Sequence, residues 1–328
     1  MDTSILGRTG RTVSVVGQGC WQFGGDWGDV TDDTAMSVLH TAADAGVTFF
    51  DTADVYGDGH SEELVGRFLK ERADDTIVVA TKMGRRANPH EPQEFTAKNL
   101  REWNDRSRRL LGVDTLDLVQ LHCPPTPVYS NDGVFDVLDE MVEEGRMKAY
   151  GVSVETVDEA MTALARPNLA SIQIILNIFR RKPLEQVLPA AKAAGVGVIA
   201  RVPLASGLLS GKFTKDTTFA ETDHRTFNRH GESFDQGETF SGVPFEEGVE
   251  AAREVAELCR DGVTPAQLAL RWIIDQPGVS SVIPGASRPS QARSNAAAGS
   301  MLPLNARQLT ALEEIYDRRI RQFVHSRW

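Results

Sequence analysis

The stretch FFDTADVYG (residues 49–57) decides how the rest of the chain is interpreted. An apolar run that begins at Val47 ends in the carboxylate Asp51, and Tyr56 follows five residues later. A short apolar run bounded by Gly46 on one side and by polar residues on the other is typical of a buried strand. We therefore expect Asp51 to lie where this strand leaves the core.

Two later predicted strands end in the same way, the first at Lys82 and the second at His122. In a parallel barrel the carboxyl ends of all strands open on one face, so these two side chains would meet Asp51 and Tyr56 in one bowl. Each residue taken alone has an ordinary structural explanation. Four different titratable types at three consecutive strand ends favour a catalytic site.

The chemistry of these four side chains is complementary. A free tyrosine has a pKa of about 10, which is too high for ready proton donation near neutrality. An ammonium group at Lys82 is expected to lower the pKa of Tyr56, and Asp51 would hold that lysine charged and in place. His122 would orient a polar group of the substrate or help to move a proton. The pattern predicts a general acid.

A proton donor without a nucleophile motif or a metal-ligand pattern indicates polar addition to a carbonyl group. The hydride for such an addition comes from a cofactor. The residues alone leave a second chemistry open, because a lysine at a barrel strand end also suits a Schiff-base aldolase that would use Lys82 covalently.

Composition places the chain among globular proteins and excludes some partners. Its 328 residues are 41% hydrophobic and 25% charged, with no linker-like segment, so we expect a single domain over residues 1–328. The net charge of −11 argues against nucleic acid and against an anionic membrane surface as partners. The sequence also lacks an apolar run of the roughly 18 residues that a membrane span needs.

Cysteine usage and the first residues of the chain favour a cytoplasmic location. Cys20, Cys123 and Cys259 are odd in number and too widely spaced for a metal knuckle, which is typical of reduced thiols. The first residues lack the charged-then-apolar pattern of a signal peptide. We expect no metal site, and the oligomeric state is not predicted.

Predicted strands and helices alternate along the chain, which indicates an α/β fold of the (β/α)8 TIM barrel type. A hairpin around residues 7–10 would cap one end, extra helices would follow the last strand, and a long loop would span 204–243. A doubly wound open sheet is the alternative, but its phosphate-binding glycine fingerprint is missing after the first strand. The predicted strands are 15–19, 47–51, 77–82, 116–122, 149–154, 171–176, 197–203 and 282–284. The predicted helices are 31–45, 61–71 with Ser61 as its N-cap, 96–111, 134–144, 156–165, 184–194 with its start uncertain because of Pro189, 245–259, 264–275, 290–298 and 305–320.

Several separated motifs together resemble the aldo-keto reductase superfamily, in its bacterial NADPH-dependent form. They are DTADVYG (residues 51–57), Ser61-Glu62, Thr81-Lys82 and Leu121-His122, and the resemblance runs from Gly17 to about Asn295. It implies a (β/α)8 barrel that binds NADPH and reduces aldehydes and ketones. It also implies that Tyr56 is the proton donor, that Lys82 and Asp51 tune it, and that His122 orients the carbonyl.

The resemblance implies a nicotinamide site with two departures from the family pattern. Ser153 and Gln173 match the residues that hold the nicotinamide amide, but Val154 stands where an asparagine is usual, with Asn177 a conceivable substitute. Arg201 stands where many members stack an aromatic ring on the nicotinamide. A guanidinium can stack on a ring, but it would be repelled by the oxidised cofactor, so Arg201 could instead face the substrate.

The phosphate groups of the cofactor are matched by two further motifs. Residues 203–212 resemble the pyrophosphate loop, in which Lys212 supplies charge, and residues 283–295 resemble the adenosine-phosphate motif, in which Arg288 would read the 2′-phosphate. Arg225 matches a basic position that some relatives use on the cofactor. The full set of expected cofactor-binding residues is Cys20, Trp21, Asp51, Ser153, Gln173, Arg201, Pro203, Leu204, Ala205, Gly207, Leu208, Lys212, Arg225, Gly285, Ser287, Arg288, Gln291 and Asn295.

The substrate is expected to be a small aldehyde or ketone, with sugars and their derivatives among the candidates. Two alternatives to a reductase remain. One is the aldolase, and the other is a cofactor-binding regulatory or redox-sensing subunit built on the same barrel. The residues expected to line the substrate pocket are Trp21, Phe23, Trp27, Tyr56, His122 and Tyr129.

Overall fold

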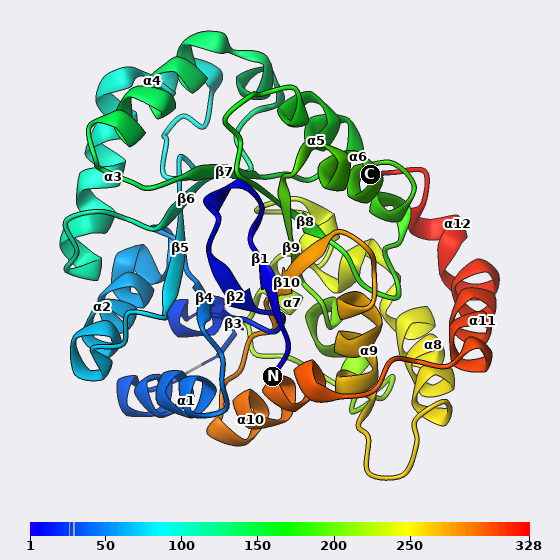
Figure 1. Cartoon of the computed structure of the whole chain (residues 1–328). Coiled ribbons are helices and arrows are strands. Elements are labelled where there is room, and N and C mark those ends of the chain that lie inside the picture. Colours follow the sequence, from blue (N-terminus) through cyan, green and yellow to red (C-terminus); the bar gives the residue numbers. More distant parts are fainter. Residues whose placement is uncertain (26, 29) are drawn as a thin grey trace.

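The computed structural model describes residues 1–25, 27, 28 and 30–328, and its centre is an eight-stranded parallel sheet rolled into a barrel (Figure 1). Neighbouring strands in the sheet follow one another in the sequence, so each connection returns to the adjacent strand. The (β/α)8 prediction is confirmed. The strands are β3 (Gln18–Gly19), β4 (Phe49–Asp51), β5 (Val78–Met83), β6 (Leu118–His122), β7 (Tyr150–Ser153), β8 (Ser171–Ile175), β9 (Gly197–Arg201) and β10 (Val279–Val282).

The barrel closes between its first and last strands. Parallel bridges join Val16 to Val282 and Gly19 to Gly285, and the amide of Gly17 donates to the carbonyl of Val282 at 2.8 Å. These contacts complete the ring, so the carboxyl ends of the strands share one opening.

Helices cover the outside of the barrel (Figure 1). Their apolar faces pack on the outer side of the strands, while a second, inner cluster that includes Phe49, Leu118 and Ile199 fills the barrel itself. The helices are α1 (Asp32–Asp44), α2 (His60–Arg72), α3 (Ala97–Leu111), α4 (Asp132–Glu143), α5 (Val157–Leu164), α6 (Val187–Ala194), α7 (His224–Phe227), α8 (Phe245–Glu257), α9 (Pro265–Ile274), α10 (Pro289–Ala297), α11 (Ala306–Ile315) and α12 (Arg321–Val324).

The last strand lies earlier than predicted, at Val279–Val282 instead of 282–284. Its two serines weaken the apolar pattern, yet Ser280 and Ser281 donate their hydroxyls to the backbone oxygens of Ile5 and Ser14 at 3.2 and 2.9 Å. Pairing satisfies these polar groups inside the structure, so the strand tolerates them.

Two helix starts also follow from local chemistry. Pro189 is the third residue of α6, in the first turn, where a missing amide hydrogen removes no helical hydrogen bond. Helix α2 starts at His60, so Ser61 is not its cap. The Ser61 hydroxyl instead donates to the carbonyl of Cys20 at 3.0 Å and lies 2.9 Å from the Thr52 hydroxyl, which ties together the loops that follow β3 and β4.

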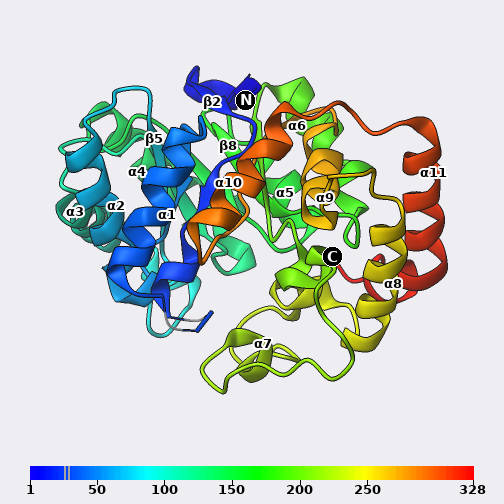
Figure 2. The ribbon, with the colours of Figure 1, turned by 90° about the horizontal axis from the view of Figure 1, so that it is seen from below.

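The predicted hairpin closes one end of the barrel. Strands β1 (Thr3–Ile5) and β2 (Thr12–Ser14) pair antiparallel, and Leu6 and Val13 are buried in the inner apolar cluster. Figure 2 shows the hairpin at one end of the molecule and the loop that carries α7 at the opposite end. The long loop therefore lies at the mouth, where the strands end.

In the part of the chain that the structure describes, no helix has the length and apolar character needed to cross a membrane.

The hairpin turn contains two glycines in the left-handed region with different surroundings. A Cβ on Gly7 (φ +48) would lie 2.1 Å from the backbone nitrogen of Gly197, whereas a Cβ on Gly10 (φ +66) would meet no atom within 4 Å. We predict that Gly10→Ala costs about 1–2 kcal/mol of unfolding free energy from backbone strain alone. Gly7→Ala should cost about 3–5 kcal/mol, because overpacking adds to the strain. Urea denaturation of both variants measures the two losses of unfolding free energy. Equal losses would show that close packing of Gly7 against Gly197 does not add to the cost.

Candidate active site

The ammonium group of Lys82 has a hydrogen-bond acceptor for each of its three protons. Its Nζ lies 2.5 Å from Asp51 Oδ1, 2.8 Å from the carbonyl oxygen of Thr52 and 3.3 Å from Tyr56 Oη. The Lys82 side chain is 1% exposed, so these contacts replace its hydration. Burial lowers the pKa of Lys82, but the Asp51 carboxylate and Tyr56 outweigh it, and the pKa is raised above its ordinary value. Lys82 is therefore a fixed cation beside the Tyr56 hydroxyl.

Asp51 is held from its other side by two amide groups. Its Oδ2 accepts hydrogen bonds from Gln173 Nε2 at 2.8 Å and from Gln120 Nε2 at 3.3 Å. The register explains this arrangement, because Lys82 lies opposite Gln120 in the pairing of β5 with β6. Side chains from β4, β5, β6 and β8 thus converge on one carboxylate.

The pKa of Tyr56 is raised above its ordinary value, which corrects the expected net lowering. Burial is the largest effect, and the opposing charge of Lys82 offsets only part of it. The phenol consequently keeps its proton at neutral pH. A group that is to donate a proton must first carry it, so the raised pKa is compatible with an acid role while Lys82 remains positioned to stabilise the phenolate.

His122 is a neutral imidazole in this site. Burial lowers its pKa well below the ordinary value, and the positive charges of Arg85, Lys82 and Arg201 lower it further. Its ring lies perpendicular to that of Tyr56, with the centroids 5.9 Å apart, and its Nδ1 has no protein partner among the described residues. A neutral imidazole can donate one hydrogen bond and accept another, which suits orientation of a polar ligand group.

A cavity of about 340 Å³ opens at the barrel mouth over these residues. Asp51, Tyr56 and His122 line it, whereas Lys82 does not. Most of the residues expected to bind a cofactor also line it, although they come from distant parts of the chain. These are Cys20, Trp21, Asp51, Gln173, Arg201, Pro203, Leu204, Gly207, Lys212, Arg225, Gly285, Ser287, Arg288 and Gln291.

Four expected cofactor residues do not line the cavity: Ser153, Ala205, Leu208 and Asn295. Ala205 and Leu208 are fully buried in the outer apolar core. The hydroxyl of Ser153 accepts a hydrogen bond from Cys123 Sγ at 3.5 Å, and Asn295 Nδ2 donates to the carbonyl of Gly285 at 3.2 Å. Asn295 thereby supports a backbone segment that does line the cavity.

Of the residues expected in the substrate pocket, Trp21 and Trp27 line the cavity together with Tyr56 and His122. Trp21 stacks on Tyr56 with ring centroids 6.1 Å apart. Phe23 and Tyr129 do not line the cavity, since Phe23 is buried in the core and the Tyr129 hydroxyl donates to the carbonyl of Ser153 at 2.9 Å. The sequence does not predict whether an aromatic side chain near a barrel mouth points into the cavity or into the core.

Asn177 is not placed to replace the asparagine missing at Val154. Its Nδ2 donates to the carbonyl of Val202 at 2.8 Å and to the Ser241 hydroxyl at 2.7 Å, and its Oδ1 accepts from the amide of Phe179 at 2.8 Å. These internal bonds occupy the side chain, which is fully buried.

Arg201 lines the cavity but is held by protein groups. Its Nη2 donates to Glu155 Oε2 at 2.9 Å and to the carbonyl of Val154 at 3.1 Å, and its Nη1 lies 3.6 Å from Glu238 Oε1. This arrangement favours the earlier alternative in which Arg201 faces the substrate side instead of stacking on a ring.

Sequence reasoning missed several residues of the site. Gln120 lies two residues before His122, so strand periodicity could have placed it on the same inward face. Glu238 and Phe213 come from the long loop, where no periodic signal exists. Gln22 lines the cavity too, and a Cβ on Gly285 would lie 2.0 Å from its side chain.

Comparisons with known proteins agree with this geometry. The family model described as Aldo/keto reductase family matches residues 15–317. Aldo-keto reductase YhdN of Bacillus subtilis (strain 168) is 33% identical over 298 residues, which cover 89% of this chain and 86% of that protein. A protein of Arabidopsis thaliana described as a probable voltage-gated potassium channel subunit beta is 31% identical over 321 residues, or 93% of each chain.

Solved structures show the same fold. The glycerol dehydrogenase AKR11B4 from Gluconobacter oxydans has a TM-score of 0.79 at 31% identity, with 97% of this chain and 96% of that chain covered. The holo form of the aldo-keto reductase AKR11C1 from Bacillus halodurans has a TM-score of 0.76 at 26% identity, with 96% of each chain covered. With the family model matching nearly the whole sequence, this chain belongs to the aldo/keto reductase family.

Proposed function

We propose that this protein is an NADPH-dependent reductase that converts a small aldehyde or ketone into an alcohol, with Tyr56 as the proton donor. The observation that carries the proposal is the contact of Lys82 Nζ with both Asp51 and Tyr56 Oη, two residues that line the cavity. Family membership and the names of oxidoreductase relatives support it.

The cavity fits a phosphorylated dinucleotide. Four Lys and Arg side chains line it in a protein whose net charge is −11, and three of them, Lys212, Arg225 and Arg288, are the expected phosphate contacts. Two glycines in the lining are held against neighbouring side chains, because a Cβ on Gly207 would lie 2.8 Å from Phe213 and one on Gly285 would lie 2.0 Å from Gln22. Two structures of an aldo-keto reductase from Klebsiella pneumoniae, each at a TM-score of 0.72 and 24% identity, are described as complexes with NADP and with NADPH.

Lys212, Arg225 and Arg288 would hold the phosphates of NADPH, which would supply the hydride for carbonyl reduction when bound. Tyr56 gives its proton to the carbonyl oxygen, and the ammonium of Lys82, 3.3 Å away, stabilises the phenolate that results. Asp51 keeps Lys82 charged, and the glutamine amides keep Asp51 in position. Neutral His122 orients the carbonyl oxygen by donating a hydrogen bond without competing as an acid.

The geometry weighs against the aldolase alternative. A Schiff base requires an unprotonated amine, but the pKa of Lys82 is raised by Asp51 and Tyr56, and its three protons have acceptors in the protein. The regulatory-subunit alternative rests on the plant relative described as a channel subunit beta. Turnover of a carbonyl substrate distinguishes it from the reductase.

We predict that Tyr56→Phe lowers the turnover number by about 10²- to 10⁴-fold, the usual contribution of a general acid, while NADPH affinity stays unchanged. Steady-state assays with an aldehyde panel and a fluorescence titration with NADPH measure the two effects. Tyr150→Phe is the matched control, because the Tyr150 hydroxyl bonds to Asp139 outside the cavity. Undiminished turnover in Tyr56→Phe, or a borohydride-trapped substrate adduct on Lys82, would contradict the proposal.

We also predict that Arg288→Ala weakens NADPH binding by about 10- to 100-fold and leaves NADH binding nearly unchanged, because a charge-assisted contact to the 2′-phosphate is lost. Fluorescence titrations with both cofactors test this. Arg293→Ala is the control, since Arg293 is an exposed residue of α10, the helix that Arg288 precedes, and does not line the cavity. Equal losses for the two cofactors would show that Arg288 does not read that phosphate.

A further inference from the structure

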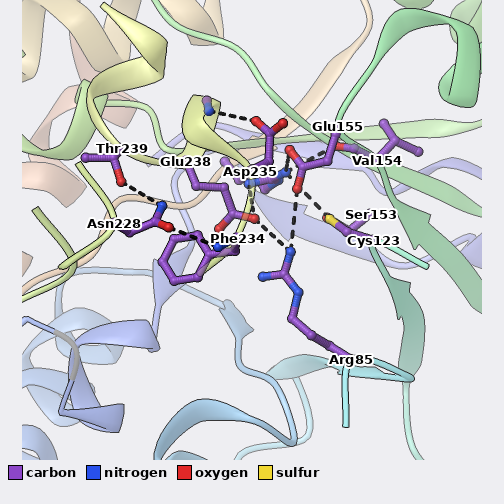
Figure 3. Close-up of polar contacts among 12 residues, drawn as sticks. Arg85, Cys123, Ser153, Val154, Glu155, Asn228, Phe234, Asp235, Glu238 and Thr239 are labelled. Atoms are coloured by element: carbon purple, nitrogen blue, oxygen red, sulfur yellow. Dashed lines mark hydrogen bonds and ion pairs between the residues drawn. The ribbon is translucent and has the colours of Figure 1, made fainter. Parts of the chain in front are cut away.

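Four charged side chains form a cluster joined by ion pairs near the catalytic residues, and Figure 3 shows three of them, Arg85, Glu155 and Glu238. Arg85 follows β5, Glu155 follows β7, Arg201 ends β9, and Glu238 comes from the long loop. Arg85 Nη2 lies 2.8 Å from Glu238 Oε1 and 3.5 Å from Glu155 Oε1. Figure 3 shows the guanidinium of Arg85 directed at the carboxylates of both glutamates. The cluster therefore joins the long loop to three strand ends of the barrel.

Two members of the cluster, Arg201 and Glu238, line the cavity. Both are close enough to the catalytic groups to affect their ionisation, since Arg201 lowers the pKa of His122 and Glu238 raises the pKa of Tyr56. A ligand at His122 and Tyr56 therefore meets this part of the wall.

Glu238 is a fixed anion. Burial raises its pKa, but Arg85 and Arg201 outweigh burial and hold the pKa far below its ordinary value. Glu155 differs, because burial raises its pKa to about 7. Of the two carboxyl groups, Glu238 lines the cavity and Glu155 does not.

The position of Glu238 is fixed by its backbone. The carbonyl of Glu238 accepts a hydrogen bond from the Ser206 hydroxyl at 3.0 Å, and the carboxylate of Asp235 accepts from the amide of Gly237 at 2.7 Å. Asp235 also accepts from Trp328 Nε1 at 3.0 Å, and Arg180 stacks on that indole at 4.2 Å. The segment that carries Glu238 is thereby anchored on both sides.

The arginines of the cluster already have protein partners. Arg201 is bound by Glu155, by the carbonyl of Val154 and by Glu238, and Arg85 is bound by both glutamates. Cys123 Sγ and the two carboxylates lie within 4.8 Å of one another, a grouping that can suit a metal ion, but the arginines neutralise these carboxylates. A ligand carboxylate that approaches these arginines also meets the negative charge of Glu238, which repels it.

We propose that Glu238 is a specificity-determining residue, which makes this site select uncharged carbonyl compounds with hydroxyl groups over those that carry a carboxylate. The inference rests on the proposed reductase function and names its substrate class. A hydroxyl group can donate a hydrogen bond to Glu238 without breaking the ion pairs, whereas a second anion beside it is rejected.

Two aldehydes that differ at one position test the proposal: 4-(hydroxymethyl)benzaldehyde and 4-carboxybenzaldehyde. In the unmodified protein with NADPH we expect kcat/KM to favour the hydroxymethyl compound by at least about tenfold. Glu238→Gln keeps nearly the same side-chain shape but removes the negative charge. We expect it to move the ratio at least about tenfold toward the carboxylate compound, because one repulsive charge contact is lost. Quenching of tryptophan fluorescence by each aldehyde gives the ratio of affinities in parallel, because Trp21 and Trp27 line the cavity.

Glu254→Gln is the matched control. It removes the same charge from a glutamate that pairs with Arg318 and Arg319 and does not line the cavity, so the ratio should not move. Glu238→Asp, which keeps the charge, should retain most of the original ratio. A ratio that moves less than about twofold in Glu238→Gln, or an unmodified protein that treats both aldehydes alike, would overturn the proposal.

The outcomes separate this inference from the proposed function. If the protein reduces neither aldehyde, the result counts against the reductase proposal. The ratio of affinities from fluorescence would then still test whether Glu238 selects against the carboxylate. Reduction of both with an unchanged ratio would leave the reductase standing and reject the role of Glu238. If Glu238→Gln fails to fold, the ratio in the unmodified protein decides.

Discussion

An ammonium group and a carboxylate, both shielded from water, lie at the centre of the barrel mouth. The side chains of Lys82 and Asp51 are 1% and 3% exposed, and taking two such charges out of water costs several kcal/mol each. Their mutual contact recovers this cost only when every remaining donor and acceptor is satisfied. The carbonyl of Thr52, the hydroxyl of Tyr56 and the amides of Gln120 and Gln173 meet that condition. The barrel topology supplies these partners, because it brings the ends of β4, β5, β6 and β8 together at the mouth.

The rest of the site is arranged around this pair by charge. Burial, reinforced by nearby positive groups, lowers the pKa of His122 and keeps its imidazole neutral, while burial raises the pKa of Tyr56 and keeps the proton on its hydroxyl. The long loop contributes both Lys212 and Glu238 to the cavity, a cation on one segment and an anion on another. The loop thus provides groups suited to an anionic cofactor as well as a group that disfavours an anionic substrate. The catalytic side chains thus come from the barrel, whereas the long loop contributes the charged groups that would select among ligands.

Much of this could be predicted from the sequence, for physical reasons that are specific to each element. Asp51, Lys82 and His122 end apolar strands, and the barrel topology alone brings such ends together. Glu238 could not be found in this way, because it lies in a loop whose path depends on tertiary contacts such as those of Ser206 and Asp235. The net pKa of Tyr56 also escaped prediction, since it depends on how far burial outweighs the lysine charge. Strand β10 was misplaced because its serines are satisfied only by the folded hairpin.

Lys82 and Asp51 stabilise each other as a coupled buried pair, and a double-mutant cycle of unfolding free energies measures that coupling. Lys82→Met leaves a buried carboxylate without its cation and should cost about 3–5 kcal/mol. The double variant Asp51→Asn/Lys82→Met removes both charges and should regain at least half of that loss, with a coupling energy of about 2 kcal/mol or more. Additive losses, in which the destabilisation of the double variant equals the sum of the two single-variant losses, would show that the two charges do not stabilise each other.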